Sequence, residues 1–240
     1  MLFAAAQEHS SMSTDSDARF WDRMSRKYSK HAIADQGGYE RTLNRTRSLL
    51  RPDDKVLELG CGTGSMALRL AGDVRSYLAT DLSAEMIAIA REKQSVTAIP
   101  ALAFLTATAE ASIFETGRYN AVLGFNYLHM VRDVQGTLRR INTLLAPGGL
   151  FISKTPCLRD MNPLLSLVLL PGMRAIGRAP YVSCFRQVEL CELVSSAGFD
   201  ILATENHATK GNDRRPCIVA RKRFGVEGRR TRFEPECFAV

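Results

Sequence analysis

The chain has 240 residues, of which 45% are hydrophobic, so it can bury one sizeable core. Its six cysteines include no C-x-x-C pair and have no histidine cluster beside them, so we expect no metal site, no disulfide framework and a reducing compartment. The formal net charge of +7 favours association with nucleic acid or anionic lipid but says nothing of the fold.

The N-terminal region divides into two parts. Residues 1–6 are apolar but too few for a secretory signal and have no basic residues before them, and residues 10–17 are polar. We therefore expect residues 1–17 to form a disordered segment of a cytoplasmic protein. In the following stretch, Phe20, Trp21, Met24 and Tyr28 recur at helical spacing and predict a helix that docks through its apolar face.

Strands and helices alternate after Pro52, which is the pattern of a largely parallel α/β sheet covered by helices. Apolar runs predict seven strands, at residues 55–59, 76–80, 103–106, 121–125, 150–154, 199–205 and 217–221. Periodicity and capping residues predict helices at residues 65–71, 84–92, 131–145 and 187–197. We expect one domain over residues 18–223, with an insertion at 156–186 and a C-terminal tail at 224–240.

The most informative segment joins the first strand to its helix. The strand contains one acid, Glu58, and runs directly into glycines at alternate positions, Gly60, Gly62 and Gly64. Such a turn bares backbone to a nucleotide-like ligand, but a dinucleotide fingerprint would need Gly or Ala where Ser65 stands. A buried acid is costly without a partner, and an ammonium group on the ligand would be one.

The run Glu58-Leu-Gly60-Cys61-Gly62-Thr63-Gly64 resembles the first motif of class I S-adenosylmethionine-dependent methyltransferases, and the resemblance covers about residues 53–222. It implies a Rossmann-like, seven-stranded, mostly parallel sheet with helices on both faces, an N-terminal helical cap and an insertion after strand 5. It also implies S-adenosylmethionine as cofactor, with Glu58, Gly60, Cys61, Gly62 and Gly64 beside its methionine moiety and ribose. In this family an aromatic residue near Tyr28 closes over the cofactor.

Residues after the second and third strands are candidates for holding the adenosine. Asp81 can accept hydrogen bonds from both ribose hydroxyls, or it can serve as the N-cap of the helix that follows. By resemblance, Leu82 flanks the adenine ring, although ordinary core packing explains it equally. Thr108 stands where relatives often carry Asp to accept from the adenine amino group, and a hydroxyl accepts more weakly than a carboxylate. Ala109 would supply a backbone contact.

The fourth strand ends at Asn126, Tyr127 and Leu128, followed by His129. Ligands of open α/β sheets bind outside the carboxyl ends of strands, so we expect Asn126 to line the cofactor pocket. The Asn/Asp-Pro-Pro-aromatic motif of many enzymes that methylate nucleic-acid bases is absent here. His129 is the candidate general base for an O-methylation, and the alternative is a packing or hydrogen-bonding histidine.

The insertion at residues 156–186 is the part of the sequence that bears on the identity of the methyl acceptor. Its apolar run at residues 163–170 is too short to span a bilayer, and Met173, Ile176 and Tyr181 follow it. The composition predicts a small hydrophobic acceptor or a membrane-facing patch, unless the segment merely packs on the sheet.

Two other functions stay open. One is a nucleic-acid methyltransferase or RNA-binding protein that uses Arg214, Arg215 and the basic residues beyond them. The other is a non-catalytic protein that keeps the fold for binding or assembly. The sequence does not predict the oligomeric state.

Overall fold

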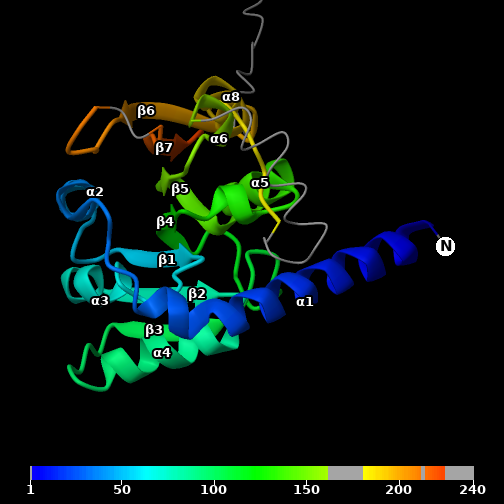
Figure 1. Cartoon of the computed structure of the whole chain (residues 1–240). Helices are drawn as coiled ribbons and strands as arrows, with labels where there is room; N and C mark the ends of the chain where they lie inside the picture. Colours follow the sequence, from blue (N-terminus) through cyan, green and yellow to red (C-terminus); the bar gives the residue numbers. More distant parts are fainter. Residues whose placement is uncertain (1, 162–180, 212–213, 225–240) are drawn as a thin grey trace, which may run out of the picture.

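A seven-stranded sheet forms the centre of the computed structural model, which describes residues 2–161, 181–211 and 214–224, with side chains from residue 15 onward. The strands are β1 (Lys55–Leu59), β2 (Ser76–Asp81), β3 (Leu102–Thr106), β4 (Tyr119–Phe125), β5 (Leu145–Lys154), β6 (Phe199–Glu205) and β7 (Cys217–Lys222). Their order is β3-β2-β1-β4-β5-β7-β6, and β7 alone runs antiparallel to both of its neighbours (Figure 1). The predicted Rossmann-like, mostly parallel fold is confirmed.

Helices cover both faces of this sheet. The helices are α1 (Leu2–Ser29), α2 (Gln36–Leu49), α3 (Ala67–Leu70), η1 (Ala71–Asp73), α4 (Ala84–Gln94), η2 (Leu128–Met130), α5 (Val134–Leu144), α6 (Leu158–Met161) and α8 (Gln187–Ser196). One core cluster joins the sheet to α2, α3 and α4 through Leu43, Leu70 and Ile87. The other joins it to α5 and α8 through Ile141 and Leu190. No helix among the described residues is long and apolar enough to cross a membrane.

Chain order reverses beside β1, because β2 lies on one side of it and β4 on the other. In open α/β sheets such a switch point leaves a crevice at the carboxyl ends of the two central strands, where ligands bind. The glycine loop after β1 and residues 126–129 after β4 both lie at this edge. The fold therefore brings together the two segments that the sequence singled out.

The N-terminal segment differs from the prediction of disorder over residues 1–17, because α1 is helical from Leu2 onward. Neither glycine nor proline interrupts residues 1–36, and Ala, Leu, Gln, Glu and Met at its start are good helix formers. The later part of α1 docks on the start of α4: Asp22 Oδ1 accepts from Ser83 Oγ at 2.6 Å and from the Glu85 amide at 3.2 Å. Figure 1 shows the helix extending away from the domain toward its N-terminus.

One predicted helix begins later than expected, and one further helix lies where none was predicted. The helix expected at residues 131–145 begins at Val134, because Asp133 caps it by accepting from the Gly136 amide at 2.8 Å. Helix α2, which the sequence did not predict, is capped in the same way by Asp35. Residues 162–180 and 225–240 lie outside the described residues, and with them the apolar run at 163–170, Met173 and Ile176.

Candidate functional site

The three glycines after β1 have left-handed backbone, with φ of +68° at Gly60, +54° at Gly62 and +76° at Gly64. Two of them also make room for core side chains. A Cβ on Gly60 would lie 2.7 Å from Tyr127 Cδ2, and one on Gly64 would lie 2.7 Å from Phe104 Cζ. These two glycines are therefore needed for packing, whatever ligand the loop holds.

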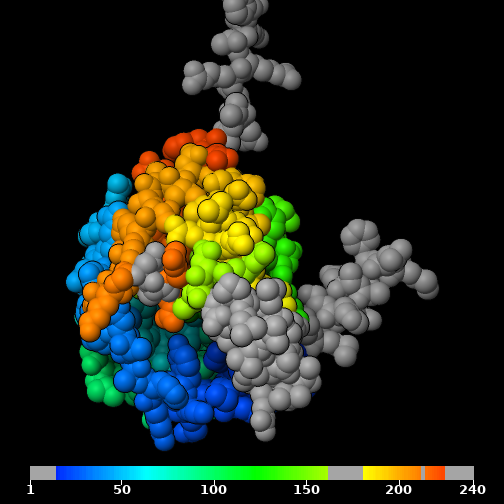
Figure 2. Space-filling view, turned by 45° about the horizontal axis from the view of Figure 1, so that its top comes forward, coloured from blue at the N-terminus to red at the C-terminus, as the bar shows by residue number. Residues whose placement is uncertain are grey.

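Gly62 has a different environment. A Cβ there would have no neighbour nearer than Tyr28 Cε1, at 3.8 Å. Gly62 and Tyr28 both line a cavity of about 1110 Å³ at the carboxyl ends of β1, β2 and β4. In Figure 2 this region is a hollow between the blue N-terminal residues and the orange residues of the β6–β7 connection. Burial raises the pKa of the Tyr28 hydroxyl, and the nearby Asp81 adds to that effect.

Asp81 connects β2 to the glycine loop. Its Oδ2 accepts from the Gly62 amide at 2.8 Å and its Oδ1 from the Ser83 amide at 2.9 Å. The N-cap of α4 is Ser83, whose hydroxyl accepts from the Met86 amide, so the alternative role of Asp81 as the cap is wrong. Burial raises the pKa of Asp81. Asp81 also lines the cavity.

The Glu58 side chain has a hydrogen-bond partner within the protein and does not face a ligand. The Tyr77 hydroxyl donates to Glu58 Oε2 at 2.8 Å, and both side chains are buried. Burial raises the pKa of Glu58 to about 7, even though the Tyr77 hydrogen bond acts in the opposite direction. Glu58 does not line the cavity. The partner that was expected to be a ligand ammonium is instead Tyr77, which the parallel pairing of β1 with β2 brings near.

Most of the residues predicted to bind the cofactor come together. Those that line the cavity are Tyr28, Gly60, Gly62, Asp81, Leu82, Thr108, Ala109 and Asn126. Glu58, Cys61 and Gly64 lie behind the loop instead. Cys61 is buried, and its amide donates to the Thr80 carbonyl at 2.9 Å. A further residue supports the loop from α4: Lys93 Nζ donates to Thr63 Oγ1 at 2.7 Å. A lone lysine on a helix carries no sequence signal for this role.

Asn126 has φ of +52°, a conformation that few residues other than glycine adopt. Its amide donates to the Lys154 carbonyl at 2.7 Å, which fixes the turn after β4. Tyr127 then packs its ring against Gly60 and Gly124. Backbone strain of this kind clusters at ligand sites, and here it aims the following residues at the cavity.

His129 follows this turn and lines the cavity with only 7% of its surface exposed. Its Nδ1 is buried and has no hydrogen-bond partner among the described residues. Burial lowers the pKa of the imidazole to about 4, and the charge of Arg215 lowers it further. His129 is therefore neutral at pH 7.

The far side of the cavity is mostly apolar. Its wall there contains Met130, Val131, Pro156, Leu158, Met161, Tyr181 and Val182. The segment that carries Tyr181 is tied to the turn after β4, because the Ser183 amide donates to the His129 carbonyl at 2.7 Å and the Ser183 hydroxyl to the Val131 carbonyl at 2.8 Å. Arg215, one of the basic residues that the sequence offers for nucleic-acid binding, also lines the cavity, from the β6–β7 connection.

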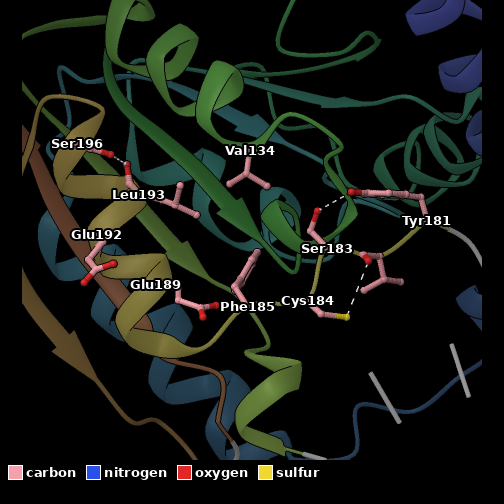
Figure 3. A pocket seen from close by; sticks show the side chains of 10 residues that line it. Val134, Tyr181, Ser183, Cys184, Phe185, Glu189, Glu192, Leu193 and Ser196 are labelled. Atoms are coloured by element: carbon pink, nitrogen blue, oxygen red, sulfur yellow. Dashed lines mark hydrogen bonds between the residues drawn. The ribbon is translucent and has the colours of Figure 1, made fainter. Parts of the chain in front are cut away.

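A second, shallower pocket of about 610 Å³ lies between α8 and residues 181–185 (Figure 3). Its two acids are Glu189 and Glu192, and Glu189 is already occupied by Arg159 and by the Arg186 amide. The hydroxyl groups of Ser183 and Tyr181 are 3.1 Å apart in its wall. Because this pocket contains no glycine loop or strand end, the larger cavity is the candidate site.

Comparison with known proteins agrees with this geometry. A family described as "Methyltransferase domain" matches residues 24–204. The chain is 30% identical over 169 residues to the mitochondrial arginine-hydroxylase NDUFAF5 of Danio rerio, covering 69% of this chain and 51% of that protein. It is 34% identical over 122 residues to the hybrid PKS-NRPS synthetase mpsA of Macrophomina phaseolina, covering 45% of this chain and 3% of that protein. The chain thus spans about half of one curated relative and a small part of the other.

Among solved structures, the magnesium protoporphyrin IX methyltransferase of Synechocystis PCC 6803 superimposes with a TM-score of 0.66 at 17% identity, covering 88% of this chain and 99% of that one. At that identity the likeness concerns the fold alone. The family match extends over most of the chain and includes the glycine loop, Asp81 and the turn after β4. The chain therefore belongs to the methyltransferase domain family, in its class I, S-adenosylmethionine-dependent form.

Proposed function

We propose that this chain transfers a methyl group from S-adenosylmethionine to a small acceptor with an apolar body. The observation that carries the proposal is that one cavity contains both halves of such a site. Its wall contains Gly62 and Asp81 as well as His129 and a set of apolar side chains. A cavity of about 1110 Å³ has room for a nucleoside cofactor and a small acceptor together.

The residues present fit the cofactor. The open side of Gly62 leaves bare backbone, and Asp81 offers a buried carboxyl group beside it, which suits a ribose with two hydroxyls. Leu82 and Met86 offer apolar contact for a purine, and Thr108 and Ala109 also line the cavity. Tyr28, about half exposed, would cover the ligand from α1.

The cofactor supplies an activated methyl group on a sulfonium and a good leaving group. The protein then has to orient the acceptor in line with that methyl and to exclude water. Tyr28 and Trp21 from α1 close one side of the cavity, while Leu158 and Tyr181 close another. These side chains would position the acceptor and shield the reaction from water, and they need not form covalent bonds with it.

The test is transfer of label from methyl-tritiated S-adenosylmethionine by the purified chain, with free acids, phenols, amines, thioesters and RNA as acceptors. Wild type should label one small-molecule class, and Asp81→Asn should label it far more slowly. Since one relative is named for a hydroxylation, an oxygenated and unlabelled product would contradict the proposal, as would labelling of RNA alone.

A further inference from the structure

The tautomer of His129 is constrained by its surroundings. A neutral imidazole carries its proton on one ring nitrogen and a lone pair on the other. Nδ1 is buried with no partner among the described residues, so a proton there would be an N–H without an acceptor. Such orphaned donors are rarer and costlier than an unused lone pair. The proton therefore belongs on Nε2, and His129 presents a hydrogen-bond donor to the cavity it lines.

This tautomer is unsuited to removing a proton. A histidine that acts as a base through Nε2 needs its proton on Nδ1, usually donated to a carboxylate or carbonyl that orients the ring. No such acceptor contacts Nδ1 in the described part of the chain. The buried ring also holds a proton weakly, because its pKa lies at about 4. His129 is arranged to donate to an oxygen, not to deprotonate it.

Other groups in the described wall do not replace the missing base. Asp17 is paired with Arg132, and Asp81 accepts from the glycine loop. Glu110 accepts from the Thr137 hydroxyl at 2.8 Å, and Asp133 caps α5. The remaining acid of this wall is Asp15, which is exposed on α1. The tyrosines Tyr28 and Tyr127 are protonated at pH 7, and partial burial of Tyr28 and full burial of the Tyr127 hydroxyl raise the pKa of each further.

Arg215 brings positive charge to the cavity wall near His129 and Tyr28. The guanidinium of Arg215 is close enough to lower the pKa of both His129 and Tyr28. A guanidinium has five donors in a planar fork that matches a carboxylate, so it can serve a ligand in addition to a protein partner. The other arginine of the wall, Arg132, is neutralised by Asp17 and stacks on the Tyr181 ring, with 4.5 Å from Cζ to the ring centroid.

We propose that the methyl acceptor is a carboxylate on an apolar body, held by His129 Nε2 and Arg215, and that the product is its methyl ester. The inference rests on the proposed methyl transfer. A carboxylate is already ionised at pH 7, so it needs no base. One carboxylate oxygen forms the new bond to the methyl carbon as the carbon–sulfur bond breaks. The bonding pair stays on sulfur, and no proton moves.

Neutral acceptors fit this wall less well. A phenol, alcohol, amine or carbon acid must lose a proton during or after transfer, and no described group is placed to take it. An anion brought beside a sulfonium in a cavity of low polarity is also attracted to it more strongly than in water. The apolar residues Met130, Leu158 and Met161 would then contact the body of the acid.

The test uses matched pairs that share an apolar tail: dodecanoate with dodecanol, and phenylacetate with phenylethanol. Calorimetry measures their binding to the full chain saturated with S-adenosylhomocysteine. In at least one pair the carboxylate should bind about 10-fold or more tightly than the alcohol, the effect expected of a charged hydrogen bond. Arg215→Gln should abolish that preference, and Arg215→Lys should restore part of it. Arg214→Gln is the matched control, because Arg214 is the neighbouring arginine, exposed like Arg215, and does not line the cavity.

The product provides an independent readout. Methyl esters release labelled methanol in mild alkali, whereas methyl ethers, methylamines and methyl–carbon bonds do not. Label that stays bound in alkali would overturn the proposal. So would equal binding within every pair, failure of every acid to bind, or an Arg215→Gln variant with unchanged preference. If S-adenosylhomocysteine itself fails to bind, the proposed function fails, and that outcome is distinct from all of these.

Discussion

The substitution Gly62→Ala tests whether the glycine loop faces the cofactor. The added methyl group would enter the cavity toward Tyr28, with no protein atom nearer than 3.8 Å. It therefore meets no core atom, in contrast to a methyl on Gly60 or Gly64, which would collide with an aromatic ring. We expect the variant to fold and to lose affinity for the cofactor.

Gly117→Ala is the matched control. Gly117 also has left-handed backbone, with φ of +68°, and a Cβ there would have nothing within 4 Å. It lies before β4, at the opposite edge of the sheet from the cavity. A non-glycine residue in this conformation costs roughly 1–2 kcal/mol, and in a protein of this size each kcal/mol lowers the melting temperature by roughly 2–4 °C. Both variants should therefore lose similar stability.

The assay is calorimetric binding of S-adenosylhomocysteine beside thermal unfolding without ligand. Gly62→Ala should bind at least about 10-fold more weakly than wild type, a loss of about 1.4 kcal/mol, while Gly117→Ala should bind within about 2-fold of wild type. Wild-type affinity in Gly62→Ala would refute the placement of the cofactor against this loop. Equal loss of affinity in both variants would mean that left-handed strain, not the cavity, governs binding.

Three further variants test other parts of the site. Asp81→Asn should weaken S-adenosylhomocysteine about 10- to 100-fold by removing a charged acceptor, and unchanged calorimetric affinity would exclude the ribose contact. Tyr28→Ala should speed dissociation of S-adenosylhomocysteine in stopped-flow measurements, whereas Tyr28→Phe should not; equal rates in all three proteins would mean that the ring does not cover the ligand. Because the folded pKa of Glu58 is about 7, above its usual 4.5, the folded state holds this proton more tightly, and stability falls as pH rises through that window. Glu58→Gln lacks this loss, so its melting temperature should rise relative to that of wild type between about pH 5 and about pH 8. A difference in melting temperature that does not change with pH would contradict the pKa shift of Glu58.

Much of the sheet was predictable because its strands are short apolar runs with clear ends. The bounds of β1 and β6 match the prediction, and each of the other five strands is longer than predicted at one end. Helix α2 was missed because its buried face includes Gly38, Thr42 and Thr46, which do not stand out as an apolar stripe. The hydroxyl groups of Thr42 and Thr46 donate to the backbone carbonyls one turn earlier, those of Gly38 and Thr42, so the helix buries these polar residues at little cost.

The candidate site was predictable only where local sequence defines it. Gly62 follows β1 and Asp81 is the last residue of β2, and both could be found from spacing alone. The partner of Glu58 could not, because Tyr77 reaches it across the pairing of β1 with β2. Arg215 could not either, because its place in the cavity depends on the β6–β7 connection folding back over the ends of the strands. Contacts between segments far apart in the chain decide these positions.

The most direct test of the account is a calorimetric titration of S-adenosylmethionine into the purified full chain. The account predicts one site per chain, micromolar affinity, and loss of that affinity in Gly62→Ala but not in Gly117→Ala. Absence of binding at millimolar cofactor by a folded protein would contradict its central claim.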